Sequence, residues 1–289
     1  EKRARIGRQH RPPTRWTSLV DRVWYGPFPT HRALNMPAID PAELEALRAI
    51  GRVVALARDA MLVAAEPGMS TAELDDVGRR VLEEHGARSA PQLAYDFPGC
   101  TCISVNEAIA HGVPSSDVIL AEGDLLNVDV SAELDGFWSD TGASRAIGEV
   151  PARVRKLLRE TKKAQREGMN TARAGVVVNQ IGRVIERRAK KAGFRVIRNL
   201  GGHGIGKTIH EEPHVSNHFD PSERFILYDG QVLTVEPFFT LGGTFAVEDE
   251  SDGWTLRTND GSLGAQFEHT FVVTEGEPIV LTESTIDDD

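Results

Sequence analysis

Residues 201–214, GGHGIGKTIHEEPH, hold two overlapping patterns that could each carry chemistry. The first eight residues fit G-x-x-x-x-G-K-[ST], a phosphate-binding loop, and residues 210–214 fit H-E-x-x-H, a zinc motif of peptidases. Both patterns need a helix here, either to present amides to a phosphate or to place two histidines one turn apart. Pro213 interrupts any such helix, and no apolar period continues it. We therefore reject both and expect a Gly-rich loop that exposes His203 and His210.

Two acids lie in neighbouring apolar segments, 125–134 and 137–147, which meet at Asp135-Gly136. If those two residues form a tight hairpin turn, Ser131 pairs with Asp140. Alternation of side chains then makes Asp129 and Asp140 diagonal neighbours on one face. Adjacent carboxylates in apolar surroundings need a compensating cation. On this pair alone, a metal site and a solvated hairpin face fit equally well.

The second half of the chain favours the metal. Glu236 and Glu268 are again single acids within apolar strand-like segments, 231–239 and 264–273. Together with His203, the four carboxylates form an oxygen-rich set with one imidazole, which suits divalent ions such as Mn, Co, Fe or Zn. The set has enough ligands for two ions, and paired ions activate water for hydrolysis.

The elements that must position these residues occur twice along the chain. A helix is expected to begin at Asp40-Pro41 and to end at Pro67-Gly68, and a second to run from Ser70 or Thr71 to Gly86. Strand-like segments follow. A second pair of helices then begins after Pro151 and ends at Gly193, again before strands, including 194–200. This repeat predicts an internal duplication, with the site at the seam between the halves.

Composition limits the classes of function. The chain has 289 residues and a net charge of -10, which argues against a general nucleic-acid binder. Its two cysteines, Cys100 and Cys102, are too few for a disulfide framework or a four-thiolate zinc site. No apolar run reaches the length of a membrane span or resembles a signal peptide. We expect a cytoplasmic protein with no membrane and no sequence-specific nucleic-acid partner.

Residues 1–40 differ from the rest of the chain. They hold five prolines and no sustained helical period, so we expect an extended arm before a catalytic domain at 41–289. Residues 1–15 carry six Lys or Arg against one Glu. That balance is more typical of a solvated tail than of an RNA contact.

Five stretches, taken in order, resemble the methionine aminopeptidases. They are FPGCTCISVNEAIAHGVP (97–114), NVDVSAELDGFWSDT (127–141), GGHGIGKTIHEEP (201–213), TVEP (234–237) and DGWTLRTNDGSLGAQFEHT (252–270). The resemblance implies the α+β pita-bread fold, a pseudo-two-fold duplication with an antiparallel sheet covered by helices.

The resemblance also implies a role for individual residues. The ligands of two divalent ions (Co, Mn, Fe or Zn) would be Asp129, Asp140, His203, Glu236 and Glu268, with Asp140 and Glu268 bridging. Glu236 would transfer protons. His111 and His210 would contact the scissile amide and its tetrahedral intermediate. The pocket for a methionine side chain would be formed by Phe97, Cys102, Ile209 and Trp254, together with the two histidines.

The implied activity is removal of the N-terminal methionine from nascent chains when the next residue is small. Only 32 positions separate Glu236 from Glu268, which leaves no room for the helical insertion of type II enzymes. The arm is similar to that of extended type I forms from actinobacteria, where it is thought to dock on the ribosome. Two rivals share the fold: an X-Pro peptidase, which usually has a further N-terminal domain, and a non-catalytic binding protein, which tends to lose ligands.

Overall fold

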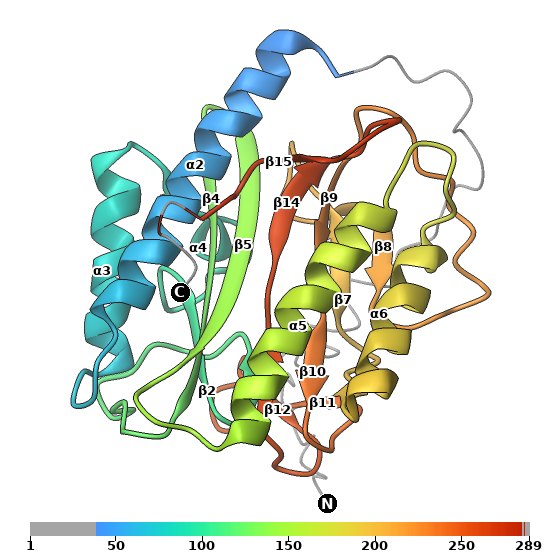
Figure 1. Cartoon of the computed structure of the whole chain (residues 1–289). Coiled ribbons are helices and arrows are strands. Elements are labelled where there is room, and N and C mark those ends of the chain that lie inside the picture. The colour runs from blue at the N-terminus through green and yellow to red at the C-terminus, as the bar shows by residue number, and fades with distance from the viewer. Residues whose placement is uncertain (1–38, 285, 287–289) are drawn as a thin grey trace, which may run out of the picture.

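The computed structural model describes residues 39–284 and 286, and these form two halves that each combine helices with antiparallel strands (Figure 1). The predicted arm, apart from its last two residues, lies outside the described residues. Four long helices flank the strands, two in each half: α2 (Pro41–Ala64), α3 (Thr71–Glu84), α5 (Ala152–Thr171) and α6 (Asn179–Ala192). The order of helices followed by strands occurs twice, as the sequence predicts.

The first two helices begin at the residues that the sequence indicates. The Asp40 carboxylate caps α2 by accepting a hydrogen bond from the backbone N–H of Ala42 at 2.8 Å. At the start of α3, Ser70 and Glu73 form a capping box. The Ser70 hydroxyl accepts from the Glu73 N–H at 3.2 Å, and the Glu73 carboxylate accepts from the Ser70 N–H at 2.8 Å. These bonds satisfy amides that would otherwise lack partners in the first turn.

The first sheet contains the predicted hairpin. Its strands are β1 (Arg88–Ser89), β2 (Cys102–Val105), β4 (Leu125–Leu134) and β5 (Phe137–Ala146). The register pairs Ser131 with Asp140, as predicted. Asp135 and Gly136 both have positive φ, 51° and 84°, which a two-residue turn of the type I′ class requires.

Helix α2 packs on the apolar face of this hairpin. Val54 of α2 shares one buried core with Leu126, Val128 and Val130 of β4. Burial of each such side chain stabilises the fold by about 1.5–3 kcal/mol. Because side chains alternate along β4, Asp129 is directed to the opposite face, away from the helix.

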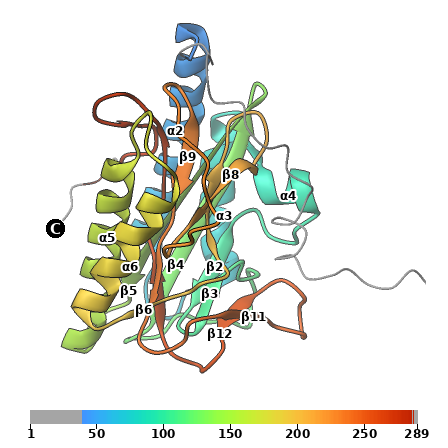
Figure 2. The same cartoon turned by 90° about the vertical axis from the view of Figure 1, so that its right-hand side faces the viewer.

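The second half packs α5 and α6 on a sheet with the strand order β15-β14-β9-β7-β8. Its strands are β7 (Gly201–Gly204), β8 (Glu211–Ser216), β9 (Val232–Val235), β14 (His269–Val272) and β15 (Ile279–Val280). Helix α6 ends at Gly193, whose φ of 83° lies in the left-handed region, as predicted. Figure 2 shows α5 and α6 on one side of the strands and the short helix α4 (Ala90–Tyr95) on the other.

Two small sheets complete the fold. One orders β13 (Gly264–Gln266), β10 (Phe238–Thr240) and β6 (Arg195–Val196), and the other orders β11 (Ala246–Glu248), β12 (Leu256–Thr258) and β3 (Ala108–Ala110). The second of these joins the halves, because β3 comes from the first half and β12 from the second.

Three strand predictions for the second half were too simple. Of residues 194–200, only two form a strand, β6. The predicted strand 231–239 is interrupted at Glu236-Pro237, where Pro237 has no N–H for a ladder bond, and forms β9 and β10. The predicted strand 264–273 is interrupted at residues 267–268 and forms β13 and β14. Both acids of this half therefore lie at breaks between strands.

The prediction of an exposed Gly-rich loop around His203 was wrong. Gly201–Gly204 is strand β7, and His203 is only 2% exposed. The glycines are needed for close backbone approach: a Cβ at Gly202 would collide with the carbonyl of Thr234, and one at Gly204 with that of Glu212. Glycine is depleted in strands on average, but it is found where another backbone comes this close.

Candidate metal centre and substrate pocket

Asp129 and Asp140 face the same space from the hairpin. Asp129 is opposite Gly142, two positions from Asp140 along β5, and the two carboxyl groups interact directly. On the other edge of β4, Asp129 is opposite Cys102 of β2. The diagonal arrangement predicted from the turn is therefore the one that the structure has.

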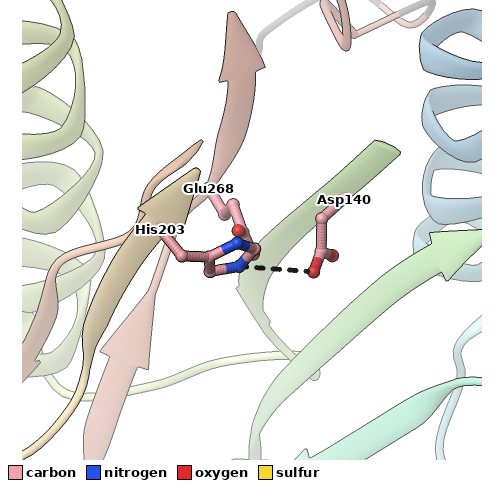
Figure 3. Close-up of side chains that lie close together, drawn as sticks. All are labelled: Asp140, His203 and Glu268. Carbon is pink, nitrogen blue, oxygen red and sulfur yellow. Dashed lines mark ion pairs between the residues drawn. The ribbon is translucent and has the colours of Figure 1, made fainter. Parts of the chain in front are cut away.

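Three ligand candidates from the second half meet this pair. His203 Nε2 lies 3.9 Å from Asp140 Oδ2 and 3.7 Å from Glu236 Oε1. One ligand atom each of Asp140, His203 and Glu268 lies within 4.8 Å of the others, and Figure 3 shows these three side chains pointing toward one another. Each is more than 60 positions from the next along the chain, so the duplicated fold brings them together.

The tautomer of His203 suits a metal ligand. Its Nδ1 lies 2.9 Å from the carbonyl oxygen of Gly204, which can only accept, so Nδ1 carries the proton. The lone pair is then on Nε2, the nitrogen that faces Asp140 and Glu236. A backbone carbonyl on the far nitrogen commonly orients a metal-binding histidine in this way.

The electrostatics of the cluster call for a cation. Burial, followed by the charge of Asp140, raises the pKa of Asp129, Glu236 and Glu268 well above the usual range. Burial also raises the pKa of Asp140 to about 6 and lowers that of His203 to about 4. Among the described residues, no Lys or Arg pairs with these four carboxylates. The set thus lacks positive charge, which divalent ions would supply.

Within this cluster, two buried oxygen atoms have no hydrogen-bond partner among the described residues, namely Asp140 Oδ1 and Glu268 Oε1. Buried polar atoms are nearly always satisfied in native proteins, so orphaned atoms need an explanation. Both belong to residues that the family resemblance predicts to be metal ligands. The donor set, the missing charge and these two atoms all fit a divalent metal site.

Backbone contacts across the seam hold the two bridging candidates together. The Asp140 N–H donates to the Thr270 hydroxyl at 3.0 Å, and that hydroxyl donates to the Asp140 carbonyl at 2.7 Å. The Thr141 hydroxyl donates to the Glu268 carbonyl at 2.9 Å. The Glu268 carboxylate itself accepts from Gln266 Nε2 at 3.0 Å. Strand β5 of the first half and the segment before β14 are therefore fixed relative to each other.

A buried ion pair on α2 extends this network. Arg58 Nη2 lies 2.7 Å from Asp59 Oδ1, and each side chain is only 3% exposed. Arg58 Nη1 donates to the Thr141 hydroxyl at 2.5 Å and to the Thr282 carbonyl at 3.2 Å. Sequence reasoning missed this pair because an Arg-Asp dipeptide within a helix resembles a solvated face.

The predicted pocket residues border one cavity next to the acids. Phe97, Cys102, Ile209 and Trp254 all line it, as do Asp129, Asp140 and Glu236. The rings of Phe97 and Trp254 meet edge to face, with centroids 5.2 Å apart. Burial, followed by the charge of Asp129, raises the pKa of Cys102, which keeps the sulfur as an uncharged thiol. The cavity is therefore lined by apolar side chains on one part of its surface and by carboxylates on another.

The two predicted histidines line the same cavity. His111 has a φ of 52°, and its buried position lowers its pKa to about 4. Burial, followed by the neighbouring His203, also lowers the pKa of His210 well below the usual range. Both imidazoles are therefore neutral near pH 7, and each offers one N–H donor.

Tyr95 also lines this cavity, and sequence reasoning did not single it out. It lies on α4, a helix that the sequence analysis did not predict. The signal was present, because Ser89 before Ala90-Pro91 is a typical helix start, with Ser as cap and Pro in the first turn.

Comparison with known proteins agrees with the fold and the site. The model of metallopeptidase family M24 matches residues 45–275. The chain is 51% identical over 242 residues to methionine aminopeptidase 2 of Bacillus subtilis, which covers 83% of this chain and 97% of that protein.

Solved structures give the same result. The crystal structure of a methionine aminopeptidase from Thermotoga maritima superposes with a TM-score of 0.83 at 30% identity, over 86% of this chain and all of that one. The one from Rickettsia prowazekii has a TM-score of 0.81 at 33% identity, with coverage of 86% and 100%. The chain belongs to metallopeptidase family M24 and, within it, to the methionine aminopeptidases. Within the described residues, none of the helices combines the length and apolarity needed to cross a bilayer.

Proposed function

We propose that the chain is a metal-dependent aminopeptidase that removes the N-terminal methionine from nascent polypeptides when the second residue is small. One observation supports it most: four carboxylates and a histidine gather at the seam with no compensating cation among the described residues, and three of the carboxylates, those of Asp129, Asp140 and Glu236, line a pocket with an apolar wall. The names of the relatives support the methionine specificity.

Asp129, Asp140, His203, Glu236 and Glu268 would hold two divalent ions (Co, Mn, Fe or Zn), with Asp140 and Glu268 between them. When bound, such ions act as Lewis acids toward the peptide carbonyl and lower the pKa of water. The side chains of the protein carry the remaining chemistry.

Glu236 is the proposed proton carrier. It takes one proton from the attacking water while the water oxygen bonds to the carbonyl carbon of methionine. It then delivers that proton to the leaving nitrogen as the C–N bond breaks. His111 and His210, both neutral and both in the pocket wall, would donate to the amide and to the oxygen of the tetrahedral intermediate.

The substrate side chain would lie against Phe97, Cys102, Ile209 and Trp254. An edge-to-face aromatic pair and a neutral thiol form an apolar, polarisable surface suited to a thioether. The free N-terminus would come near the carboxylates, which favour a cationic amine.

Within the methionine aminopeptidases, we assign the chain to the type I class with an N-terminal extension. The separation of Glu236 and Glu268 by 32 positions supports type I. A cytoplasmic location, a catalytic domain at 41–289 and a ribosome contact through residues 1–40 remain predictions. If deletion of residues 1–40 leaves ribosome co-sedimentation unchanged, the ribosome contact is wrong.

The direct test compares two peptides. We expect hydrolysis of Met-Ala-Ser, with release of methionine, and no hydrolysis of an X-Pro-X peptide. Cleavage of only the X-Pro-X peptide would make the chain an X-Pro peptidase. Cleavage of neither, by protein isolated without stoichiometric metal, would indicate a non-catalytic binding protein.

A further inference from the structure

The hydroxyl of Tyr95 contacts Nδ1 of His210, 115 positions further along the chain. The two rings are tilted, with centroids 5.7 Å apart, and both line the pocket. Tyr95 therefore touches a residue that is proposed to contact the substrate.

The position of Tyr95 is fixed by its surroundings. Ser89 caps α4 by accepting from the Gln92 N–H at 3.4 Å, and the Ser89 hydroxyl donates to the Cys100 carbonyl at 2.7 Å. The Tyr95 ring packs on a small core that includes Ala90 and Ile209, the residue before His210. The cap of α4 and this core thus hold the Tyr95 ring beside the imidazole.

The direction of the hydrogen bond between Tyr95 and His210 decides the tautomer of His210. Burial, followed by the charge of Asp140, raises the pKa of Tyr95 to about 12, so the hydroxyl keeps its proton. A neutral imidazole has one N–H and one acceptor nitrogen. If Tyr95 donates to Nδ1, the His210 proton must lie on Nε2.

His203 provides a contrast within the same site. Its ring centroid lies 4.3 Å from that of His210, but its Nδ1 faces the Gly204 carbonyl and carries the proton. Its Nε2 therefore carries a free lone pair, which a metal ligand needs. A donor to a developing oxygen anion needs the opposite tautomer.

We propose that Tyr95 is a positioning residue that holds His210 in the Nε2–H tautomer, with this donor directed into the pocket. The inference rests on the proposed role of His210 as a donor to the substrate. Two neighbouring histidines are then held in opposite tautomers, His203 by a backbone carbonyl for the metal and His210 by a phenol for the substrate.

Kinetics of Tyr95→Phe test the proposal, with Tyr228→Phe as the matched control outside the pocket. For the zinc-loaded enzyme on Met-Ala-Ser, we expect kcat to fall about 10- to 100-fold, the usual effect of losing an orienting partner, with KM changed less than about threefold. Bound zinc should be unchanged. In a His210→Asn background, Tyr95→Phe should have almost no further effect.

The tautomer can be measured directly in the zinc-loaded wild type. With ¹⁵N-labelled histidine, and His210→Asn to assign the signals, NMR should show the proton on Nε2 of His210 and on Nδ1 of His203. A proton on Nδ1 of His210 would overturn the proposal, and this measurement does not depend on how well Tyr95→Phe folds.

Unchanged kcat in Tyr95→Phe would also overturn it, as would an equal loss in the His210→Asn background. These outcomes differ from failure of the proposed function, in which the wild type itself would not cleave Met-Ala-Ser. The tautomer measurement would still decide the role of Tyr95 in that case.

Discussion

The two halves of the molecule supply their acids to the seam in different ways. Asp129 and Asp140 lie within the continuous strands of a hairpin, where the pleat sets the direction of each side chain. Glu236 and Glu268 lie at breaks, one between β9 and β10 and one between β13 and β14. Local geometry therefore directs the first pair, whereas contacts with the rest of the fold direct the second.

The break at Glu268 shows how such contacts act. The backbone N–H of Glu268 donates to the Gly142 carbonyl at 2.8 Å, and Phe267 forms an isolated bridge with Ala143. Both partners belong to β5 of the first half. The acid of the second half is thus placed by the strand that carries Asp140, which couples the two bridging candidates.

The largest effect on activity is expected for Glu236, which lies at the break between β9 and β10. Glu236→Gln keeps the size of the side chain but removes its ability to carry a proton, so kcat on Met-Ala-Ser should fall about 10²- to 10⁴-fold. Glu248→Gln, at an exposed acid on β11, is the matched control. A kcat within threefold of the wild type would remove Glu236 from the proton pathway.

The largest effect on stability is expected for the Arg58–Asp59 ion pair, which connects α2 to the seam between the halves. Arg58→Met removes the guanidinium that neutralises the buried Asp59 carboxylate, although the Ser284 hydroxyl still donates to that carboxylate at 3.0 Å. Loss of one member of a buried ion pair typically costs about 3–5 kcal/mol of unfolding free energy. Urea unfolding measures this cost, with exposed Arg80→Met as the control. We expect Arg58→Met/Asp59→Asn to recover part of the loss. A cost below about 1 kcal/mol for Arg58→Met would show that the pair does not stabilise the junction.

A smaller loss of stability is expected where the backbones of β7 and β9 approach each other closely in the second half. Gly202→Ala would place a Cβ against the Thr234 carbonyl, which cannot move without shifting β9. We expect a loss of about 1–3 kcal/mol in thermal or urea unfolding, as for other overpacked sites. Gly276→Ala, at an open position, should be neutral. Equal stability of the two variants would mean that β7 does not need its glycines.

The smallest expected effect, per pH unit, is the pH dependence of stability caused by Glu223, a largely buried carboxyl outside the metal centre. Burial raises the pKa of Glu223 to about 7, although the Ser216 hydroxyl donates to it at 2.5 Å. Between pH 4.5 and 7 the folded state then holds a proton that the unfolded state has lost. Stability should fall with rising pH in this window, by at most about 1.4 kcal/mol per pH unit, relative to Glu223→Gln. Parallel pH profiles for the two proteins would contradict the raised pKa.

The sequence predicted the parts of the molecule that local rules control. Helix caps at Asp40 and Ser70 and the turn at Asp135-Gly136 depend on a few neighbouring residues, and the structure confirms all three. The diagonal of Asp129 and Asp140 follows from that turn. Local chemistry also correctly excluded a helix after Thr208, since Glu211–Ser216 is a strand.

Features set by distant contacts could not be predicted in this way. The strand at His203 depends on glycines that fit against β8 and β9, and composition alone favoured a loop there. The roles of His111 and His210 and the pocket wall were reached only through the family resemblance. Tyr95 and Arg58 were missed because each acts on a residue more than 80 positions away.

The most direct test of the central claim is a metal titration of the stripped protein. We expect no hydrolysis of Met-Ala-Ser without metal, and recovery of activity as Mn or Co binds with a stoichiometry of up to two ions per chain. Asp140→Asn/Glu268→Gln should bind neither ion tightly. Full activity in the stripped protein, or tight binding by that double variant, would contradict a metal centre built by the two halves together.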